Sequence, residues 1–155
     1  MVILVTGTPG TGKSTLARKL AHEQERAVLH ISDLLEQEDL DCEWDANNQC
    51  FLVDVVALTQ VLDEHIEMDD ELIIDGHLAH EVSPEHVERC IVCKCDLKEL
   101  KSRLEDRGYS EEKVRENLDC EIFDVCFTEA IERGHDPEVY WSSEEPSQPQ
   151  DDDYV

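Results

Sequence analysis

The sequence predicts an α/β fold in which a parallel β-sheet is covered by helices on both faces. Three observations lead to this prediction. Short apolar segments alternate along the chain with segments of helical periodicity, which is typical of parallel strands joined by helices. A glycine-rich loop separates the first apolar segment from the first helical one. A length of 155 residues with 40% hydrophobic side chains is sufficient for one core, so we expect a single domain.

Five segments are expected to form the strands of this sheet because each is short and apolar. They are Val2–Thr6, Ala27–His30, Glu71–Asp75, Val87–Cys95 and Val139–Trp141. Apolar residues at helical spacing predict four helices. They are a helix that follows the glycine loop and contains Leu16, Ala17 and Leu20, then Asp54–Glu67, Asp96–Arg107 and a long helix over Ser110–Arg133. We expect Gly108 to end the third helix and Ser110 to cap the fourth.

The chain is strongly acidic, with 39 Asp and Glu residues against 13 Lys and Arg residues and a formal net charge of −26. Phosphate backbones need a basic face, so this balance argues against a general nucleic-acid binder and against direct DNA binding. Two interpretations of the acidic surface stay open. It is adapted to high intracellular salt, or it forms an acidic face for a basic partner such as a ribosomal protein, and both can hold together.

No apolar run approaches the roughly 20 residues of a membrane span. The first residues also lack the basic start and long apolar stretch of a signal peptide, so we expect a cytoplasmic protein without membrane contact. Residues 142–155 are polar and acidic, with two prolines and no Lys or Arg, and are predicted to be a disordered tail. This tail either keeps the protein soluble or docks a partner. The globular domain is then expected over residues 1–141.

The seven cysteines of a cytoplasmic chain are expected to be reduced. Cys90, Cys93 and Cys95 are spaced closely enough to suggest a metal site, but they lie within a predicted strand. Because side chains alternate along a strand, Cys90 and Cys93 face opposite sides of the sheet and cannot bind one ion together. We interpret these residues as small members of the core.

Residues 7–14 match the phosphate-binding pattern G-x-x-x-x-G-K-[ST] and lie between a predicted strand and a predicted helix. The glycines allow backbone N–H groups to surround phosphates, and the amino end of the helix adds its positive dipole. Lys13 is expected to contact the β- and γ-phosphates, and the Ser14 hydroxyl to bind Mg²⁺. The sequence therefore predicts a nucleoside triphosphate site.

Four further residues are candidates for this site. Asp75 ends an apolar strand, as expected of an acid that holds the water shell of Mg²⁺, although a capping role is the alternative. His77 is suited to order a water molecule or to contact the γ-phosphate, unless it is a plain loop histidine. Arg103 and Arg107 share one helix face, and Arg107 adjoins a possible mobile lid from which it could move onto the triphosphate. Structural ion pairing is the alternative for both arginines.

Three parts of the sequence together resemble the adenylate kinase isoenzyme 6 family, which consists of small P-loop enzymes of eukaryotes and archaea. Two parts are the phosphate loop and the segment DGH at residues 75–77. The third and most specific part comprises RLEDRGY at 103–109, EN at 116–117 and CEIF at 120–123. The likeness runs from Val2 to about Ala130.

The resemblance implies a three-layer P-loop nucleoside kinase fold with a five-stranded parallel sheet, an acceptor-binding insert over about residues 30–53 and a lid over about residues 106–116. It implies adenylate kinase activity (ATP + AMP = 2 ADP) with Mg²⁺, and ATPase activity. It also implies a role in maturation of the small ribosomal subunit through a platform ribosomal protein. The implied ATP contacts are Gly10, Gly12, Lys13, Ser14, Thr15 and Arg107. The metal ligands are then Ser14 and Asp75, and the catalytic residues Lys13, His77 and Arg107.

The sequence departs from the family pattern in three places. Residues 27–88 contain 18 acidic residues and no Lys or Arg, and Glu36 stands where the family commonly places a basic residue for the AMP phosphate. Lys94 stands where the family strand ends in Arg, and bidentate phosphate contact is lost there. The closing C-terminal helix is replaced by the acidic tail.

These departures leave three functions open: an adenylate kinase, an ATPase switch in ribosome assembly, and a nucleotide-gated acidic binding module without turnover. A GTPase is not expected, because the guanine-binding pattern Asn-Lys-x-Asp is absent from the sequence.

Overall fold

The computed structural model describes residues 1–38, 40–45 and 50–143, with the backbone alone for 41–45 and 50–52. Its strands are β1 (Val2–Gly7), β2 (Val28–His30), β3 (Asp41–Asp45), β4 (Cys50–Val53), β5 (Ile73–Asp75), β6 (Val87–Lys94) and β7 (Pro137–Trp141). Its α-helices are α1 (Lys13–Gln24), α2 (Ile31–Gln37), α3 (Val55–Met68), α4 (Leu97–Asp106), α5 (Glu111–Ile122) and α6 (Val125–Glu132). Two short 3₁₀ helices, η1 (Ala79–Glu81) and η2 (Pro84–His86), lie between β5 and β6.

The main sheet contains five parallel strands in the order β2-β5-β1-β6-β7, which confirms the predicted fold. β1 is central and all six of its residues are buried, which explains why Val2–Val5 form a continuous apolar run rather than an alternating one. The register pairs Val5 with Asp75 on one side and Gly7 with Cys93 on the other. The carboxyl ends of β5, β1 and β6 therefore meet at the same edge of the sheet.

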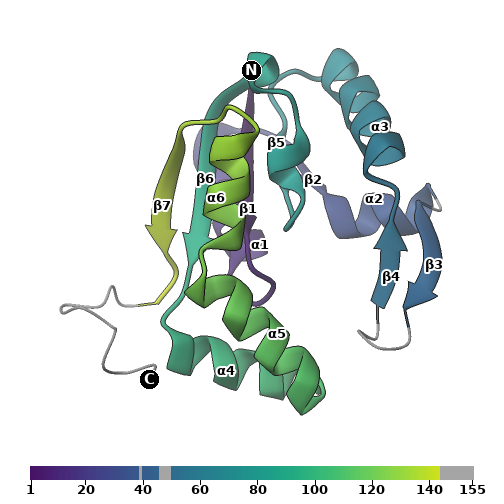
Figure 1. The fold of residues 1–155 in the computed structure, drawn as a ribbon. Coiled ribbons are helices and arrows are strands. Elements are labelled where there is room, and N and C mark those ends of the chain that lie inside the picture. Colours follow the sequence, from purple (N-terminus) through teal and green to yellow (C-terminus); the bar gives the residue numbers. More distant parts are fainter. Residues whose placement is uncertain (39, 46–49, 144–155) are drawn as a thin grey trace.

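Helices cover both faces of this sheet (Figure 1). On one face, side chains of α2, α3 and α6 pack in a cluster that includes Val2 and Leu4 of β1. On the other face, α1 packs against Ile3 and its neighbours. Cys90 belongs to the first cluster and Cys93 to the second, so the prediction that they face opposite sides is confirmed.

The helices α4 and α5 form a separate pair at the carboxyl ends of the strands, below the sheet in Figure 1. They are joined by their own apolar cluster, formed by Cys95, Leu100, Leu104 and Val114. Gly108, with φ of 78°, lies in the turn between them, and the Ser110 side chain caps α5 by accepting from the Lys113 N–H. Both of these predictions are confirmed.

The prediction of one long helix over Ser110–Arg133 is wrong. The helix ends at Ile122, and a second helix, α6, begins at Val125. Asp124 between them has φ of 51°, in the left-handed region, which interrupts the helical hydrogen bonding. Its carboxylate forms an ion pair with Lys94 at the end of β6, so a side chain from a distant strand contacts the break.

An antiparallel hairpin of β3 and β4 forms a second small sheet that we did not predict. It follows α2 and precedes α3, and it lies to one side of the main sheet in Figure 1. The hairpin falls within residues 30–53, where the family resemblance places the acceptor-binding insert.

The first two residues of the predicted acidic tail are hydrogen-bonded. The Ser142 N–H donates to the Lys94 carbonyl (2.9 Å), and the Ser143 Oγ accepts from the Asp96 N–H (2.8 Å). The prediction for residues 144–155 lies outside the described residues.

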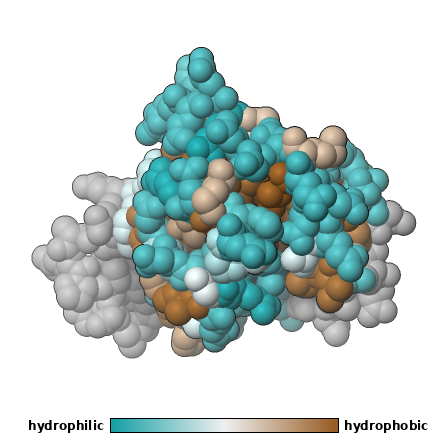
Figure 2. All heavy atoms as spheres, turned by 90° about the horizontal axis from the view of Figure 1, so that it is seen from above, coloured by the Kyte–Doolittle hydropathy of each residue, from teal (hydrophilic) through white to brown (hydrophobic). Residues whose placement is uncertain are grey.

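The surface agrees with the acidic composition of the chain. The face at the top of Figure 1 is mainly hydrophilic, and its hydrophobic side chains lie in separate patches (Figure 2). Among the described residues, no helix is both long and apolar enough to cross a membrane.

Candidate nucleotide-binding site

The phosphate loop lies at the carboxyl end of β1, in the middle of the sheet, which is where α/β folds bind ligands. Its conformation requires glycine at two positions. Gly7 has φ of 148°, and a Cβ there would lie 2.5 Å from the Cys93 carbonyl oxygen. Gly10 has φ of 91°, and a Cβ there would lie 3.0 Å from Leu100. The glycines of the motif therefore let the loop approach both β6 and α4 closely.

Lys13, the first residue of α1, lies half-buried beneath the loop. Its Nζ donates to the Thr8 carbonyl oxygen (3.1 Å). Burial lowers the pKa of Lys13, and the charge of Arg107 acts in the same direction. An ammonium group with few water contacts gains more from a nearby anion than an exposed one does. This position suits a phosphate group.

A buried acid, Glu121, supports the loop from α5. Its Oε1 accepts from the Thr8 hydroxyl (3.1 Å), and its Oε2 accepts from the Cys95 N–H (2.9 Å). Burial raises the pKa of Glu121, and the two hydrogen bonds oppose that shift. Glu121 thus joins the phosphate loop to the end of β6. We did not predict this role, because Glu121 entered the sequence analysis only as part of the family motif.

Arg103 also supports the loop. Its Nη1 donates to the Gly10 carbonyl (3.2 Å) and to the Ser142 Oγ (3.1 Å), and its Nε pairs with Glu99 one turn away. These contacts favour a structural role for Arg103 over a role as a phosphate ligand.

Asp75 and His30 lie side by side at the carboxyl ends of β5 and β2. They are paired in the sheet register, and both carboxylate oxygens of Asp75 lie 2.8 Å from the His30 Nδ1. Asp75 is buried, whereas His30 is partly exposed. The sequence analysis did not select His30, because its distance from Asp75 depends on which strands pair.

His77 lies two residues after Asp75, at the carboxyl end of β5. It is exposed to solvent. Its carbonyl oxygen accepts from the Thr6 hydroxyl (3.4 Å). Desolvation by the surrounding protein, followed by the charge of Lys13, lowers the pKa of His77 to about 4. Solvent at the exposed side of the ring offsets part of this effect. The direction of the shift favours a neutral imidazole at neutral pH.

Arg107 ends α4 and extends into solvent at the edge of the loop. Among the described residues, its guanidinium has no hydrogen bond or ion pair of the kind that holds Arg103. A cation without a protein partner is available for a ligand anion.

Two cavities meet at the phosphate loop. One, of about 260 Å³, is lined by Lys13, Ser14, Asp75, His77 and Arg107 together with residues of α2. The other, of about 430 Å³, lies between α1, α4 and the end of β7. They share four lining residues: Gly10, Gly12, Thr15 and Arg107. All the predicted site residues therefore line one of these two cavities.

The residues present fit a magnesium ion. The Ser14 hydroxyl and the Asp75 carboxylate line the same cavity and are oxygen ligands of the kind that Mg²⁺ prefers.

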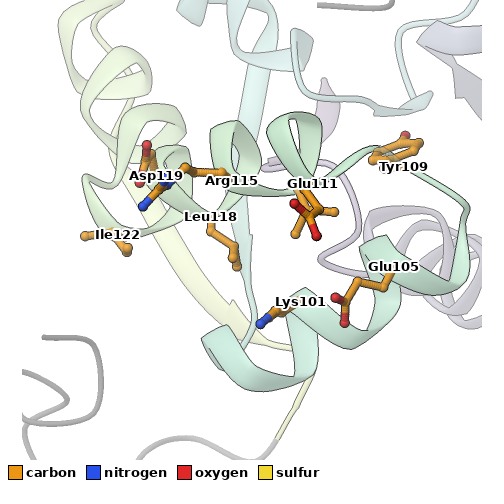
Figure 3. A pocket seen from close by; sticks show the side chains of 9 residues that line it. Lys101, Glu105, Tyr109, Glu111, Arg115, Leu118, Asp119 and Ile122 are labelled. Atoms are coloured by element: carbon orange, nitrogen blue, oxygen red, sulfur yellow. The ribbon is translucent and has the colours of Figure 1, made fainter.

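A third cavity, of about 490 Å³, lies between α4 and α5 (Figure 3). Leu118 and Ile122 contribute apolar surface to it, and Lys101, Glu105 and Arg115 contribute charged side chains. It shares no lining residue with the two cavities at the phosphate loop, so it is separate from the candidate site.

Comparisons with known proteins agree with this geometry. Residues 3–124 match a family model described as an AAA domain. The chain is 36% identical over 130 residues to a "Putative adenylate kinase" of Methanocaldococcus jannaschii, covering 84% of this chain and 72% of that protein. It is 34% identical over 131 residues to an "Adenylate kinase isoenzyme 6 homolog" of Caenorhabditis elegans, with coverages of 84% and 72%. The chain belongs to the adenylate kinase isoenzyme 6 family.

Solved structures of two other kinases share the fold. A shikimate kinase from Bacteroides thetaiotaomicron has a TM-score of 0.55 at 13% identity and covers 92% of this chain and 86% of its own. A deoxyadenosine kinase from M. mycoides has a TM-score of 0.55 at 16% identity and covers 90% of each chain. At these identities the likeness concerns the fold alone.

Few cations surround the phosphate cavity among the described residues. The α2 residues that line the phosphate cavity are Ile31, Ser32 and Leu35, none of which is charged. The positive charge of that cavity comes from Lys13 and Arg107. Lys94 is paired with Asp124 and lies 5.7 Å from the centre of the Trp141 ring.

Proposed function

We propose that this chain transfers the γ-phosphoryl group of ATP to AMP, giving two molecules of ADP, with Mg²⁺ as cofactor. One observation carries the proposal: Lys13, Ser14, Asp75, His77 and Arg107 line a single cavity at the carboxyl end of the central strand. Family membership makes the chain a nucleotide kinase, and AMP as the acceptor is the part that we propose.

The protein contributes position and charge to this reaction rather than covalent chemistry. The backbone of the phosphate loop and Lys13 bind the β- and γ-phosphates. Arg107 offsets the negative charge that spreads over the transferred group. Ser14 and Asp75 would hold a magnesium ion, which would supply positive charge next to the phosphates. The AMP phosphate is already a nucleophile, so no general base is required.

ATP hydrolysis is a second candidate function, and a specific observation favours it. The region that contains the insert, residues 27–88, has no Lys or Arg to bind the phosphate of AMP. Hydrolysis needs only the ATP half of the site and an ordered water molecule. A neutral His77 at the mouth of the cleft is suited to accept a hydrogen bond from that water.

Product analysis separates the two functions. Purified protein is incubated with ATP and Mg²⁺ in molar KCl, with and without AMP, and ADP is resolved from inorganic phosphate. AMP-dependent ADP with little phosphate supports the kinase. Phosphate release that is indifferent to AMP supports the ATPase. Nucleotide binding without either product would favour a binding module whose partner affinity changes with the nucleotide.

Two variants test the site itself. Lys13→Ala removes the phosphate ligand, and we expect at least a 100-fold loss of either activity, in line with the loss of one electrostatic group. Lys98→Ala, on an exposed part of α4, is the matched control. His77→Ala should reduce hydrolysis more than transfer to AMP. Near-normal turnover by Lys13→Ala would refute the assignment of the phosphate loop.

Family resemblance also suggests a role in maturation of the small ribosomal subunit, with a platform ribosomal protein as the partner. We expect the chain to co-sediment with immature small subunits in a manner that depends on nucleotide. Equal sedimentation with ATP, with ADP and without nucleotide would contradict a nucleotide-dependent role.

A further inference from the structure

We propose that His80, Glu81 and Glu129 form a binding site for one divalent transition-metal ion of the zinc type, behind the loop that carries His77. The His80 Nε2 lies 2.8 Å from the Glu129 Oε2 and 3.9 Å from the Glu81 Oε1, and the three ligand atoms all lie within 4.8 Å of one another. Tetrahedral ligands bound at about 2.0–2.1 Å lie roughly 3.3 Å apart. The observed distances bracket this value, so small side-chain adjustments would suffice.

The chemistry of the three donors favours zinc over the magnesium of the nucleotide site. An imidazole nitrogen with two carboxylates is a donor set that suits Zn²⁺, whereas Mg²⁺ and Ca²⁺ prefer oxygen alone. The two carboxylates offset most of the charge of a divalent ion, because Arg133 already neutralises part of the charge of Glu81. The site is therefore distinct from Ser14 and Asp75 in its ligand chemistry.

Two of the ligands are already oriented by other residues, as is usual for metal ligands. The second ring nitrogen of His80, Nδ1, lies 2.8 Å from the Thr6 Oγ1. Arg133 donates to both oxygens of Glu81, with its Nε 2.9 Å from Oε2 and its Nη2 3.2 Å from Oε1. These contacts fix His80 and Glu81 before any ion binds.

The third ligand provides access from solvent. The side chain of Glu129, on α6, is 43% exposed, whereas those of His80 and Glu81 are 1% and 9% exposed. An ion would enter beside Glu129 and could keep a water molecule as its fourth ligand. If the His80 Nε2 carries a proton toward Glu129, binding of the ion releases that proton to solvent. The nitrogen lone pair then binds the ion. No oxidation or reduction occurs in this step.

Metal binding at this site would affect the loop that carries His77. His80 and His77 belong to one short segment, and the Thr6 hydroxyl contacts both the His80 ring and the His77 carbonyl. An ion shared by η1 and α6 would therefore fasten this segment to the helix, and we expect the melting temperature to rise with zinc.

Titration of the full chain with ZnCl₂ tests the proposal. Molar KCl is used to suppress loose binding to the acidic surface, and nucleotide is omitted so that the result is independent of phosphoryl transfer. We expect one tight equivalent in the wild type. Glu129→Gln should weaken binding at least tenfold, within the range found for metal-site changes. Glu132→Gln, an exposed acid on the same helix, should bind as the wild type does.

Two results would overturn the proposal. One is equal zinc affinity and stoichiometry in the wild type and Glu129→Gln. The other is a thiolate-to-metal charge-transfer band when Co²⁺ replaces zinc, which would assign the ion to the cysteines. The melting temperature provides a further check, since the zinc-induced rise should disappear in Glu129→Gln and remain in Glu132→Gln.

Discussion

A buried carboxylate outside the motif, that of Glu121, helps to hold the phosphate loop in its conformation. Glu121 accepts one hydrogen bond from the Thr8 hydroxyl and one from the Cys95 N–H. We expect Glu121→Ala to lower the free energy of unfolding by about 1–3 kcal/mol, because it leaves a buried donor unsatisfied. The KM for ATP should rise at the same time, because Thr8 lies within the loop.

Denaturant unfolding and ATP kinetics measure these two effects. Glu112→Ala, an exposed acid on the same helix, is the control and should change neither. If Glu121→Ala altered stability but left the KM for ATP unchanged, Glu121 would have no part in positioning the loop.

Three thiols are expected to be unreactive: those of Cys90 and Cys93, which are buried, and that of Cys126, which is partly buried. Burial raises the pKa of Cys90 to about 12 and the pKa values of Cys93 and Cys126 to about 11. At pH 8, a thiol with a pKa three units higher is ionised in about one molecule in a thousand. Since the thiolate is the nucleophile, we expect these three residues to react slowly with alkylating reagents in the native protein.

Peptide mapping by mass spectrometry after brief alkylation checks this expectation. The same reagent in denaturant should label all seven cysteines, which shows that each one can be detected. Rapid labelling of Cys93 in the native protein would show that the region around Lys13 opens to solvent.

At the scale of elements, the sequence predicts the five strands of the main sheet well, but it misses the β3–β4 hairpin and predicts the helix after Ser110 poorly. A buried parallel strand is a continuous apolar run, and this signal is local. The break at Asp124 has no glycine or proline to mark it, and the Lys94 side chain that pairs with Asp124 lies 30 residues earlier in the chain. His30 beside Asp75 could not be predicted for the same reason, because the order of the strands decides it. The phosphate loop was predictable because its pattern is contiguous.

The left-handed conformation at Asp124 gives a direct test of this break. We expect Asp124→Val to destabilise the protein by about 1–2 kcal/mol, because a β-branched residue tolerates a positive φ poorly. Asp124→Gly also removes the ion pair with Lys94 but accepts the backbone conformation, so it should cost less. Thermal or denaturant unfolding compares the two variants, and equal losses would mean that backbone strain does not contribute.

The whole molecule carries a large excess of negative charge, and few cations offset it. Several of them are already paired, as Arg26 is with Glu88, Arg89 with Glu138 and Arg133 with Glu81. The remaining acids repel one another at low salt, because the Debye length is about 10 Å at 0.1 M. At 1 M the Debye length falls to about 3 Å, and the repulsion is much weaker. Repulsion of this kind destabilises the compact state.

We therefore expect the melting temperature to rise by several degrees between 0.1 M and 2 M KCl, with most of the rise below 1 M, where the screening length changes most. Calorimetry or circular dichroism across a KCl series measures it. Sucrose at matched osmolality is the control, because it favours compact states without screening charge. A melting temperature that does not change with KCl, or an equal rise in sucrose, would mean that repulsion between the acids does not limit stability. The interpretation of the acidic surface as a face for a basic partner would then be favoured.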